Sequence, residues 1–445
     1  MEEVSLLDKI IDNMPEVQAP KQKKLGFKTK LKWTLMILTI FFVLGLIPLF
    51  GLGANALGQF EFLSIVLGAS FGSIISLGIG PIVTASIVLQ LLNGSGLIKF
   101  DLSSDEGRRR FQGVQKLMSV GFIILEAFIY VRMGGLSPIA GIPMWILIIQ
   151  LFLGGLLIMF MDEVISKWGF GSGISLFIAA GVSQTIFIRI FNPLASPNNP
   201  GVAAGALPQL FQQLASGNPV GAAIQFSFIT STIIVFLIVV FTQAMKVELP
   251  LSFGRIRGQG VKWPLNFFYT SNIPVILVAA LLANLQLLSN FFPSMTFLQD
   301  FTRAPNLLKQ LITGSLSVAN IWHALIYLLL FVGGSIIFGI FWVQTAGLDA
   351  KSQAQKIRES GLQIPGFRKD QRVLERMLER YIWPLTIMGS IAVGLLAALA
   401  DLTGAFGSGT GILLTVMIIY QLYQEIAQQH MMDMNPAMRK FIVGK

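Results

Sequence analysis

Hydrophobic residues in this chain are gathered into long, almost unbroken runs separated by short polar segments. A helix needs about 20 mostly apolar residues to cross a lipid bilayer. Ten runs reach that length, with ends defined to a few residues: 33–52, 74–93, 115–133, 142–161, 174–191, 222–244, 270–290, 321–345, 382–400 and 409–428. The pattern predicts an all-α polytopic membrane protein with ten transmembrane helices.

One further apolar stretch, 54–70, would make eleven spans if it crossed the membrane. With ten spans, one side of the membrane carries 28 of the 32 Lys and Arg residues, whereas eleven spans would divide them 21 to 11. Cytoplasmic segments are enriched in Lys and Arg, so the ten-span arrangement is favoured and both termini are predicted to be cytoplasmic. A helix over 54–70 would reach only about 25 Å, short of a hydrocarbon core of about 30 Å. We therefore predict a re-entrant segment that enters from the external side.

The spans fall into two groups of five, which an external loop rich in Pro, Asn, Gly and Ala separates. Because five is odd, the second group runs inverted relative to the first. Inverted repeats commonly place the working site at the interface of the two halves. The predicted segments are an interfacial cytoplasmic segment (1–32), the first half (33–191), the external hinge loop (192–221), the second half (222–428) with cytoplasmic loops 245–269 and 346–381, and a cytoplasmic tail (429–445).

Composition agrees with a membrane class and excludes several kinds of chemistry. The chain is 54% hydrophobic, 12% charged and free of cysteine, with a mean hydropathy of +0.71. Thiolate metal sites and disulfides are therefore excluded, and no nucleotide-binding, serine-hydrolase or zinc-protease motif is present. His323 and His430 have no metal-ligand neighbours at useful spacing, and Glu126 is a lone acid inside the third span. We expect no enzyme activity and no cofactor.

Both large cytoplasmic loops are basic. Arg255 and Arg257 lie in a Gly-flanked tip of loop 245–269, and loop 346–381 carries eight Lys and Arg with five Asp and Glu. Such charge is usual for topology or lipid contact. It also suits docking of a polyanion such as ribosomal RNA. The residues alone leave both interpretations open.

Specific segments resemble a known family in order along essentially the whole chain. They are GFKTKLKWT (26–34), SLGIGPIVTASIVLQLL (76–92), DEVISKWGFGSGISLFIAAGVSQTIF (162–187), the RIRG tip (255–258), SNIPVILVAALLANLQ (271–286), IPGFR (364–368) and GSGTGILLTVMIIYQLYQ (407–424). The chain thereby resembles SecY, the pore-forming subunit of the Sec channel, in its archaeal and eukaryotic-type branch. The external stretch 291–320 matches poorly.

The resemblance implies two five-helix halves around an hourglass pore with an apolar constriction. By motif position, the ring residues would be Ile79, Val83, Ile174, Ile178, Ile276 and Leu414. The re-entrant segment would be the plug that seals the resting pore. The plug positions singled out are Asn55, Leu57, Phe60, Glu61, Phe62 and Ile65.

The family also implies an opening toward lipid, and partners. Thr84 and Asn284 would lie at this lateral gate, and Arg255, Arg257 and Arg368 would contact a ribosome or another partner. Further expected partners are SecE-type and SecG/Secβ-type small membrane subunits, the nascent polypeptide, membrane lipids and targeting machinery, all at an archaeal-like plasma membrane. The function expected is passage of secretory polypeptides across the membrane and sideways release of hydrophobic segments.

A secondary transporter of small solutes is the alternative, supported by the inverted halves and the Gly/Pro-broken helices. A transporter would need coupling-ion ligands near the middle of the bilayer, and the apolar spans supply almost none.

Overall fold

A computed structural model describes residues 11, 13–21, 25–55, 69–94, 97–98, 100, 105–196, 199–253, 260–270, 273–291, 301–359, 362–363 and 371–434. The fold is predominantly α-helical, as the apolar pattern predicts. Eight helices of the described chain are long and apolar enough to cross a membrane, and the apolar helix 80–89 is shorter. Helix is the expected form because in lipid every backbone N–H and C=O must be satisfied within the segment.

Ten helices overlap the ten predicted spans. They are α2 (Phe27–Leu46), α4 (Gly80–Gly94), α5 (Asp105–Arg132), α6 (Met144–Trp168), α7 (Gly173–Phe191), α9 (Pro219–Ala244), α10 (Ile273–Phe291), α13 (Val318–Thr345), α15 (Gln371–Leu402) and α16 (Gly409–Met434). Large apolar side chains such as Leu46, Phe128 and Phe241 are exposed on them. Water would make that exposure unfavourable, and lipid does not.

The chain forms two compact units. Unit 1 contains residues 1–183 and 418–445, and unit 2 contains residues 184–417. The last helix of each predicted half, α7 or α16, contributes to both units. The predicted domain limits, which follow the spans, stay a prediction.

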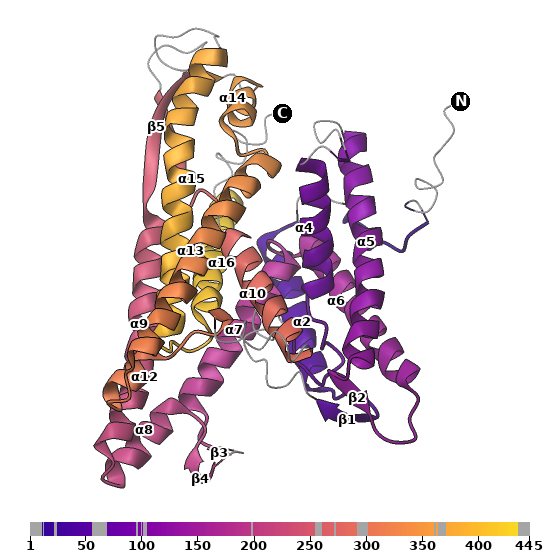
Figure 1. Cartoon of the computed structure of the whole chain (residues 1–445). Helices are drawn as coiled ribbons and strands as arrows, with labels where there is room; N and C mark the ends of the chain where they lie inside the picture. Colours follow the sequence, from indigo (N-terminus) through magenta and orange to yellow (C-terminus); the bar gives the residue numbers. More distant parts are fainter. Residues whose placement is uncertain are drawn as a thin grey trace. The chain divides into compact units, whose positions relative to one another are not determined.

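In unit 1, α5 packs against α4 and α6, and α2 packs against α6 (Figure 1). A two-stranded antiparallel sheet joins β1 (Leu52–Asn55) to β2 (Leu136–Pro138). Residues 13–21 lie along the end of α6. There, the Val17 N–H donates to Glu163 and the Trp168 Nε1–H donates to the Gln18 carbonyl. The first ten residues of the predicted interfacial segment lie outside the described part of the chain.

In unit 2, α13 packs against α10 and α15, and Figure 1 shows these helices running together. The connection between the halves is not a plain loop. It forms the hairpin of β3 (Ala195–Ser196) and β4 (Asn199–Ala203), then the helix α8 (Ala206–Ala215), which packs against α9. A short helix, α12 (Leu307–Ile312), precedes α13.

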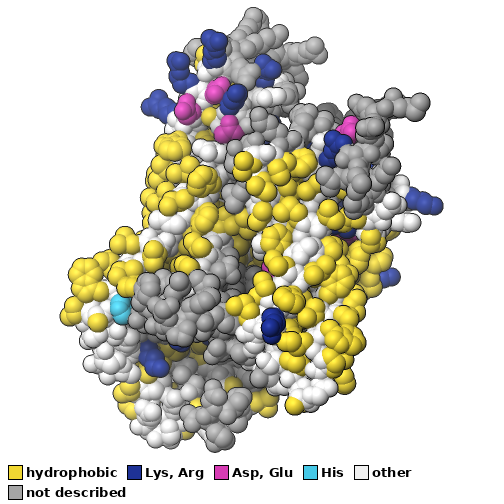
Figure 2. Space-filling model, turned by 45° about the vertical axis from the view of Figure 1, so that its right-hand side comes forward, with side chains coloured by type: hydrophobic (Ala, Val, Ile, Leu, Met, Phe, Trp, Pro, Cys, Tyr) yellow, Lys and Arg dark blue, Asp and Glu magenta, His cyan; other side chains and the backbone are white. Residues whose placement is uncertain are grey.

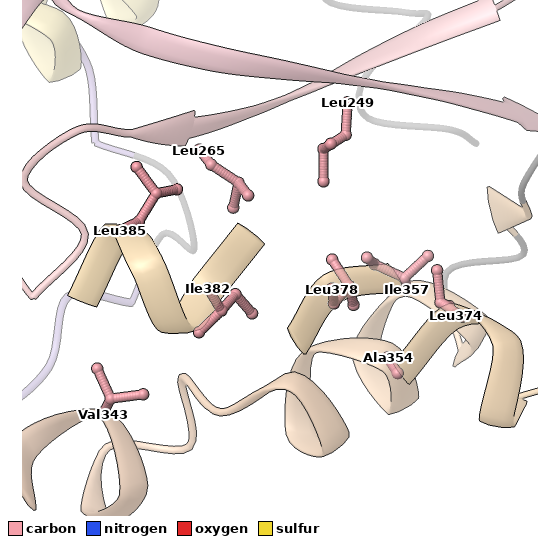
Figure 3. Close-up of a cluster of buried hydrophobic side chains, with 9 residues drawn as sticks. All are labelled: Leu249, Leu265, Val343, Ala354, Ile357, Leu374, Leu378, Ile382 and Leu385. Atoms are coloured by element: carbon pink, nitrogen blue, oxygen red, sulfur yellow. The ribbon is translucent and has the colours of Figure 1, made fainter. Parts of the chain in front are cut away.

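The two basic loops build a small folded layer that the sequence analysis missed. β5 (Lys246–Phe253) is the central strand between β6 (Gly260–Asn266) and β7 (Leu362–Gln363), and α14 (Ala350–Glu359) packs on α15. Figure 3 shows the shared core, in which apolar side chains from strands and helices meet. Its residues are Leu249, Leu265, Val343, Ala354, Ile357, Leu374, Leu378, Ile382 and Leu385.

A polar–apolar alternation was the missed signal, because Val247, Leu249, Leu251 and Phe253 lie at every second position of β5. Pro250 argues against a strand in this run, because proline has no N–H to donate to a neighbouring strand. Pro250 lies opposite Lys262 of β6, and among the described residues β7 pairs with positions 252 and 253 of β5. Figure 2 shows charged side chains gathered at the end of unit 2 that holds this layer, with hydrophobic side chains over the helices below it.

Three limits, in two of the predicted spans, are wrong. The first span was expected over 33–52, but α2 begins at Phe27 and ends at Leu46, two residues before Pro48. The second was expected from residue 74, but 71–79 form turns and α4 begins at Gly80. The errors in both spans came from counting apolar residues without the backbone limits of proline and glycine.

Candidate functional site

Ile79 is held in non-helical backbone immediately before α4. Gly78 has a positive φ of 58°, which favours glycine, and Ile79 is 1% exposed. The carbonyl of Ile79 accepts bonds from the N–H groups of Ile82 and Val83 at 3.1 and 3.0 Å, so it starts the helix. Pro81 lies in the first turn of α4, where a backbone N–H would have no partner within the helix, so the N–H that proline lacks costs no hydrogen bond. These contacts give Ile79 one defined position.

The turns before Ile79 are satisfied by serines. The Gly72 N–H donates to Ser76 Oγ at 2.9 Å, and Ser76 Oγ donates to the Ser73 carbonyl at 2.5 Å. Ser73 Oγ donates in turn to the Ser70 carbonyl at 2.7 Å. Irregular backbone at membrane depth is tolerated only where such partners exist. The serines at 70, 73 and 76 were a readable signal for this broken segment, and the sequence analysis did not use it.

Ile174 and Ile178 lie one turn apart on α7, in unit 1. Ile178 is buried and Ile174 is half-buried. The Ile174 N–H donates to Asp162 Oδ1 at 2.9 Å. Asp162 therefore fixes the first turn of this helix, where a carboxylate also interacts favourably with the helix dipole.

The remaining ring candidates lie in unit 2. Ile276 is half-buried in the first turn of α10, and Leu414 is 1% exposed on α16. Val83, on α4 in unit 1, is half-buried. Four candidates therefore belong to unit 1 and two to unit 2, and a closed ring stays a prediction.

The plug prediction falls largely outside the described residues. Five of its six positions lie outside the described part of the chain: Leu57, Phe60, Glu61, Phe62 and Ile65. Asn55 is described, and it ends strand β1 instead of beginning a helix, with its Nδ2 donating to the Phe71 carbonyl at 3.0 Å. The plug prediction therefore stands without its first residues, 54 and 55, which belong to the sheet.

The other predicted contacts are only partly described. Thr84 is half-buried on α4, and Asn284 belongs to α10, although its side chain lies outside the described part. Arg255, Arg257 and Arg368 also lie outside it. Within the described residues, no group of three or more His, Asp or Glu side chains could hold a metal ion.

In unit 1, two ion pairs lie close to the contact of residues 13–21 with α6. Lys116 pairs with Glu163, and Lys167 Nζ lies 2.5 Å from Glu16 Oε1. The hydrogen bond from Lys167 lowers the pKa of Glu16 below its ordinary value of 4.5. Lys116 Nζ also donates to the Pro15 carbonyl at 2.7 Å, so Lys116 and Lys167 both attach the N-terminal segment to the helical bundle.

Comparison with known proteins covers nearly the whole chain. The SecY family model matches residues 73–423. The SecY protein translocase subunit of Methanothermobacter thermautotrophicus is 46% identical over 441 residues, which cover 96% of each chain. This supports the translocase reading and gives no support to the small-solute transporter.

Two solved structures share the fold. One is a SecY protein whose plug domain stabilises the closed state of the translocation channel and maintains a membrane seal. It is 40% identical, with a TM-score of 0.77, over 96% of this chain and 98% of that one. The other is the canine Sec61 in a ribosome–channel complex from the endoplasmic reticulum, which is 38% identical, with a TM-score of 0.78 and the same coverage.

Proposed function

Because this chain belongs to the SecY family, we propose that its pore is closed by a ring of Ile79, Val83, Ile174, Ile178, Ile276 and Leu414. The chain itself is the central subunit of a protein-conducting membrane channel and not an enzyme. It passes secretory polypeptides across the membrane and releases hydrophobic segments into lipid. The observation that carries the ring proposal is Ile79, an aliphatic side chain whose place is set by a capped, non-helical turn.

An aliphatic ring suits this task physically. It offers an extended polypeptide no hydrogen-bond partner, so varied side chains pass without being held. A narrow apolar constriction also loses its water, and hydrated ions are then excluded. All six proposed positions are Ile, Val or Leu.

The proposed plug is the stretch 56–70, which would seal the resting channel from the external side. The family relative with a sealing plug domain supports this role. The lengths agree, because a segment too short to span can enter and turn back.

Thr84 and Asn284 are proposed to line a lateral gate toward lipid. Polar side chains on apolar helices are favourable only when they find partners across a helix interface. A substrate segment of about 20 apolar residues would leave through the open gate by partitioning into the bilayer.

Arg255, Arg257 and Arg368 are proposed to dock a ribosome or another motor, and the similarity to a Sec61 in a ribosome–channel complex supports a ribosome as the partner. The driving force has to come from such a partner, because the sequence holds no nucleotide-binding motif. We further propose SecE-type and SecG/Secβ-type small subunits, contact with targeting machinery, and a cell-membrane location with both termini in the cytoplasm. The charge bias of the loops supports that orientation.

Cysteine crosslinking tests the ring, since the chain has no cysteine of its own. Ile79→Cys is combined with a single cysteine in a ribosome-stalled secretory chain, and the membranes are oxidised. Ile124→Cys is the matched control, because Ile124 is 50% exposed on the surface of α5. A disulfide at position 79 and none at 124 supports the ring. No crosslink at any ring position, with ribosomes shown to be bound, would refute it.

A further inference from the structure

The four-residue sequence Phe-Gly-Ser-Gly occurs twice, at 170–173 and at 406–409. Each copy precedes and enters the last helix of one predicted half, α7 or α16. We name these segments the first and second FGSG corners. Each corner is described within a single unit, so the two sets of contacts can be compared directly.

The first corner is held by α2 and α6. The Phe170 N–H donates to Thr34 Oγ1 on α2 at 3.0 Å, and that hydroxyl donates to the Lys30 carbonyl of its own helix at 3.0 Å. Asp162 on α6 accepts the N–H of Ile174 at 2.9 Å. Thr34 and Phe170 are both buried, at 5% and 2% exposure.

The second corner has closely similar contacts from α9 and α15, except that the N–H bound by the aspartate lies one residue earlier, on the final glycine of the corner. The Phe406 N–H donates to Thr232 Oγ1 on α9 at 2.9 Å, and that hydroxyl donates to the Phe228 carbonyl at 2.8 Å. Asp401 on α15 accepts the N–H of Gly409 at 2.6 Å. Its other oxygen accepts a hydrogen bond from the Tyr327 hydroxyl at 2.8 Å, whereas at the first corner the hydroxyl that donates to the aspartate is that of Ser172, at 3.5 Å.

The first glycine of each corner has a similar backbone conformation, whereas Ser408 of the second corner has a positive φ of 61° that Ser172 of the first corner lacks. Gly171 and Gly407 have positive φ angles of 66° and 84°. A side chain on Gly173 would lie 2.6 Å from the Asp162 backbone, and one on Gly409 would lie 2.0 Å from the Ala397 carbonyl. Both final glycines therefore permit the helix to start against the preceding helix.

Each Thr–Asp pair supplies hydrogen-bond acceptors for buried N–H groups at the start of a helix. The first N–H groups of a helix have no partner within it, and a buried N–H without a partner is costly. The threonine hydroxyl accepts a hydrogen bond from the Phe N–H and donates its own proton to a carbonyl of the threonine's helix. The aspartate supplies an acceptor in the first turn. Together they define where α7 and α16 begin.

The helices that start at these corners carry three of the proposed ring residues. Ile174 is itself the donor to Asp162, Ile178 follows one turn later, and Leu414 lies five residues beyond Gly409. We propose that Thr34, Asp162, Thr232 and Asp401 are positioning residues, a repeated device of the two halves that sets the height of the ring side chains. This inference rests on the ring described under Proposed function.

The test replaces each threonine hydroxyl without changing the shape of the side chain. Thr34→Val and Thr232→Val remove the acceptor of a buried N–H, whereas Thr34→Ser and Thr232→Ser keep it. Thr39→Val and Thr242→Val are matched controls. Thr39 is exposed and Thr242 is half-buried on the same helices, α2 and α9, and their hydroxyls also donate to the carbonyl four residues earlier.

The complete translocase complex, carrying each variant, is reconstituted in planar bilayers, and resting ion conductance is measured per folded channel. Both buried Val variants should raise the resting conductance by about tenfold, since an unpaired buried N–H favours displacement of the helix start. The Ser variants and both control Val variants should stay at the wild-type level. Asp162→Ala and Asp401→Ala should leak, and the isosteric Asp→Asn changes, which keep an acceptor, should leak less.

The proposal is overturned if the buried Val variants lower thermal stability but leave the conductance of the folded channels unchanged. It is also overturned if the Ser variants leak as much as the Val variants. The crosslink at Ile79 separates this inference from the ring itself. If the crosslink forms and the corner variants do not leak, only the positioning role fails. If position 79 never meets the substrate chain, the ring fails.

Discussion

Gly154 on α6 is expected to tolerate no side chain, because it lies against the broken segment that leads to Ile79. A Cβ at this position would lie 1.9 Å from the carbonyl oxygen of Ile74 and 2.9 Å from its carbonyl carbon. Non-bonded carbon and oxygen atoms approach to only about 3.3 Å. Gly154→Ala therefore requires α6 and this turn to separate by roughly 1.4 Å at this point.

The size of the effect follows from two opposing contributions. Overpacking in a buried site costs about 1–3 kcal/mol. Alanine has a higher helix propensity than glycine, by about 0.8–1 kcal/mol. We expect the upper end of the overpacking cost, because the clash involves backbone and not a flexible side-chain end. The net loss in the free energy of unfolding should then be about 2 kcal/mol.

Gly121→Ala on α5 is the matched control. Apart from the backbone of its own helix, no atom of the described residues lies within 4 Å of a Cβ built at Gly121, so only the propensity gain of about 0.8–1 kcal/mol applies. The two substitutions should thus change stability in opposite directions. Unfolding of the purified complex, titrated with a denaturing detergent, measures both. If Gly154→Ala is as stable as Gly121→Ala, the close approach of α6 to the broken segment is wrong.

Three further predictions concern other parts of the molecule. Leu378→Ala should destabilise the layer of β5, β6, β7, α14 and α15 by about 2–5 kcal/mol, since Leu378 is 1% exposed. Limited proteolysis should then cut this layer faster, and equal cleavage rates would contradict its core packing. Asn218→Ala should cost about 1 kcal/mol, because its side chain accepts a first-turn N–H of α9; unchanged thermal stability would argue against the cap. The carboxyl of Glu16 has a lowered pKa in the folded protein, so its contact with Lys167 stabilises the attached segment above pH 4.5 and is lost as pH falls through the lowered value. A spin label on Gln18→Cys should become mobile in that acid range, whereas a Glu16→Gln background should show no such transition.

The pattern of charge and hydropathy was sufficient to predict a membrane protein with ten apolar helices. Apolar runs located ten helices, because a hydrocarbon environment demands long segments with internally satisfied backbones. The resemblance of ordered motifs identified the family, which the comparisons confirm. The plug segment beyond residue 55, the lateral gate and the docking arginines stay predictions.

The ends of the helices and the strands of the basic loops were harder to predict from the sequence. The first span was placed six residues too far toward the C-terminus because the run of apolar residues continues through Pro48, where α2 has ended. The strands β5 and β6 were read as loops, although their alternating apolar residues were present. Their stability comes from α14 and α15, over 80 residues later in the chain, and a local window contains none of that packing.

The sequence by itself determined that the chain lies in a membrane, where its ten apolar helices lie along the chain and which family it belongs to. These properties follow from the transfer energies of single segments and from residue identities in order. The tertiary structure alone decided which polar atoms meet. Thr34 and Phe170 are 136 residues apart in the chain, and Thr232 and Phe406 are 174 apart, yet each pair forms the same hydrogen bond. The repeated FGSG letters were visible from the start, but their shared role depends on acceptors that only folding brings to them.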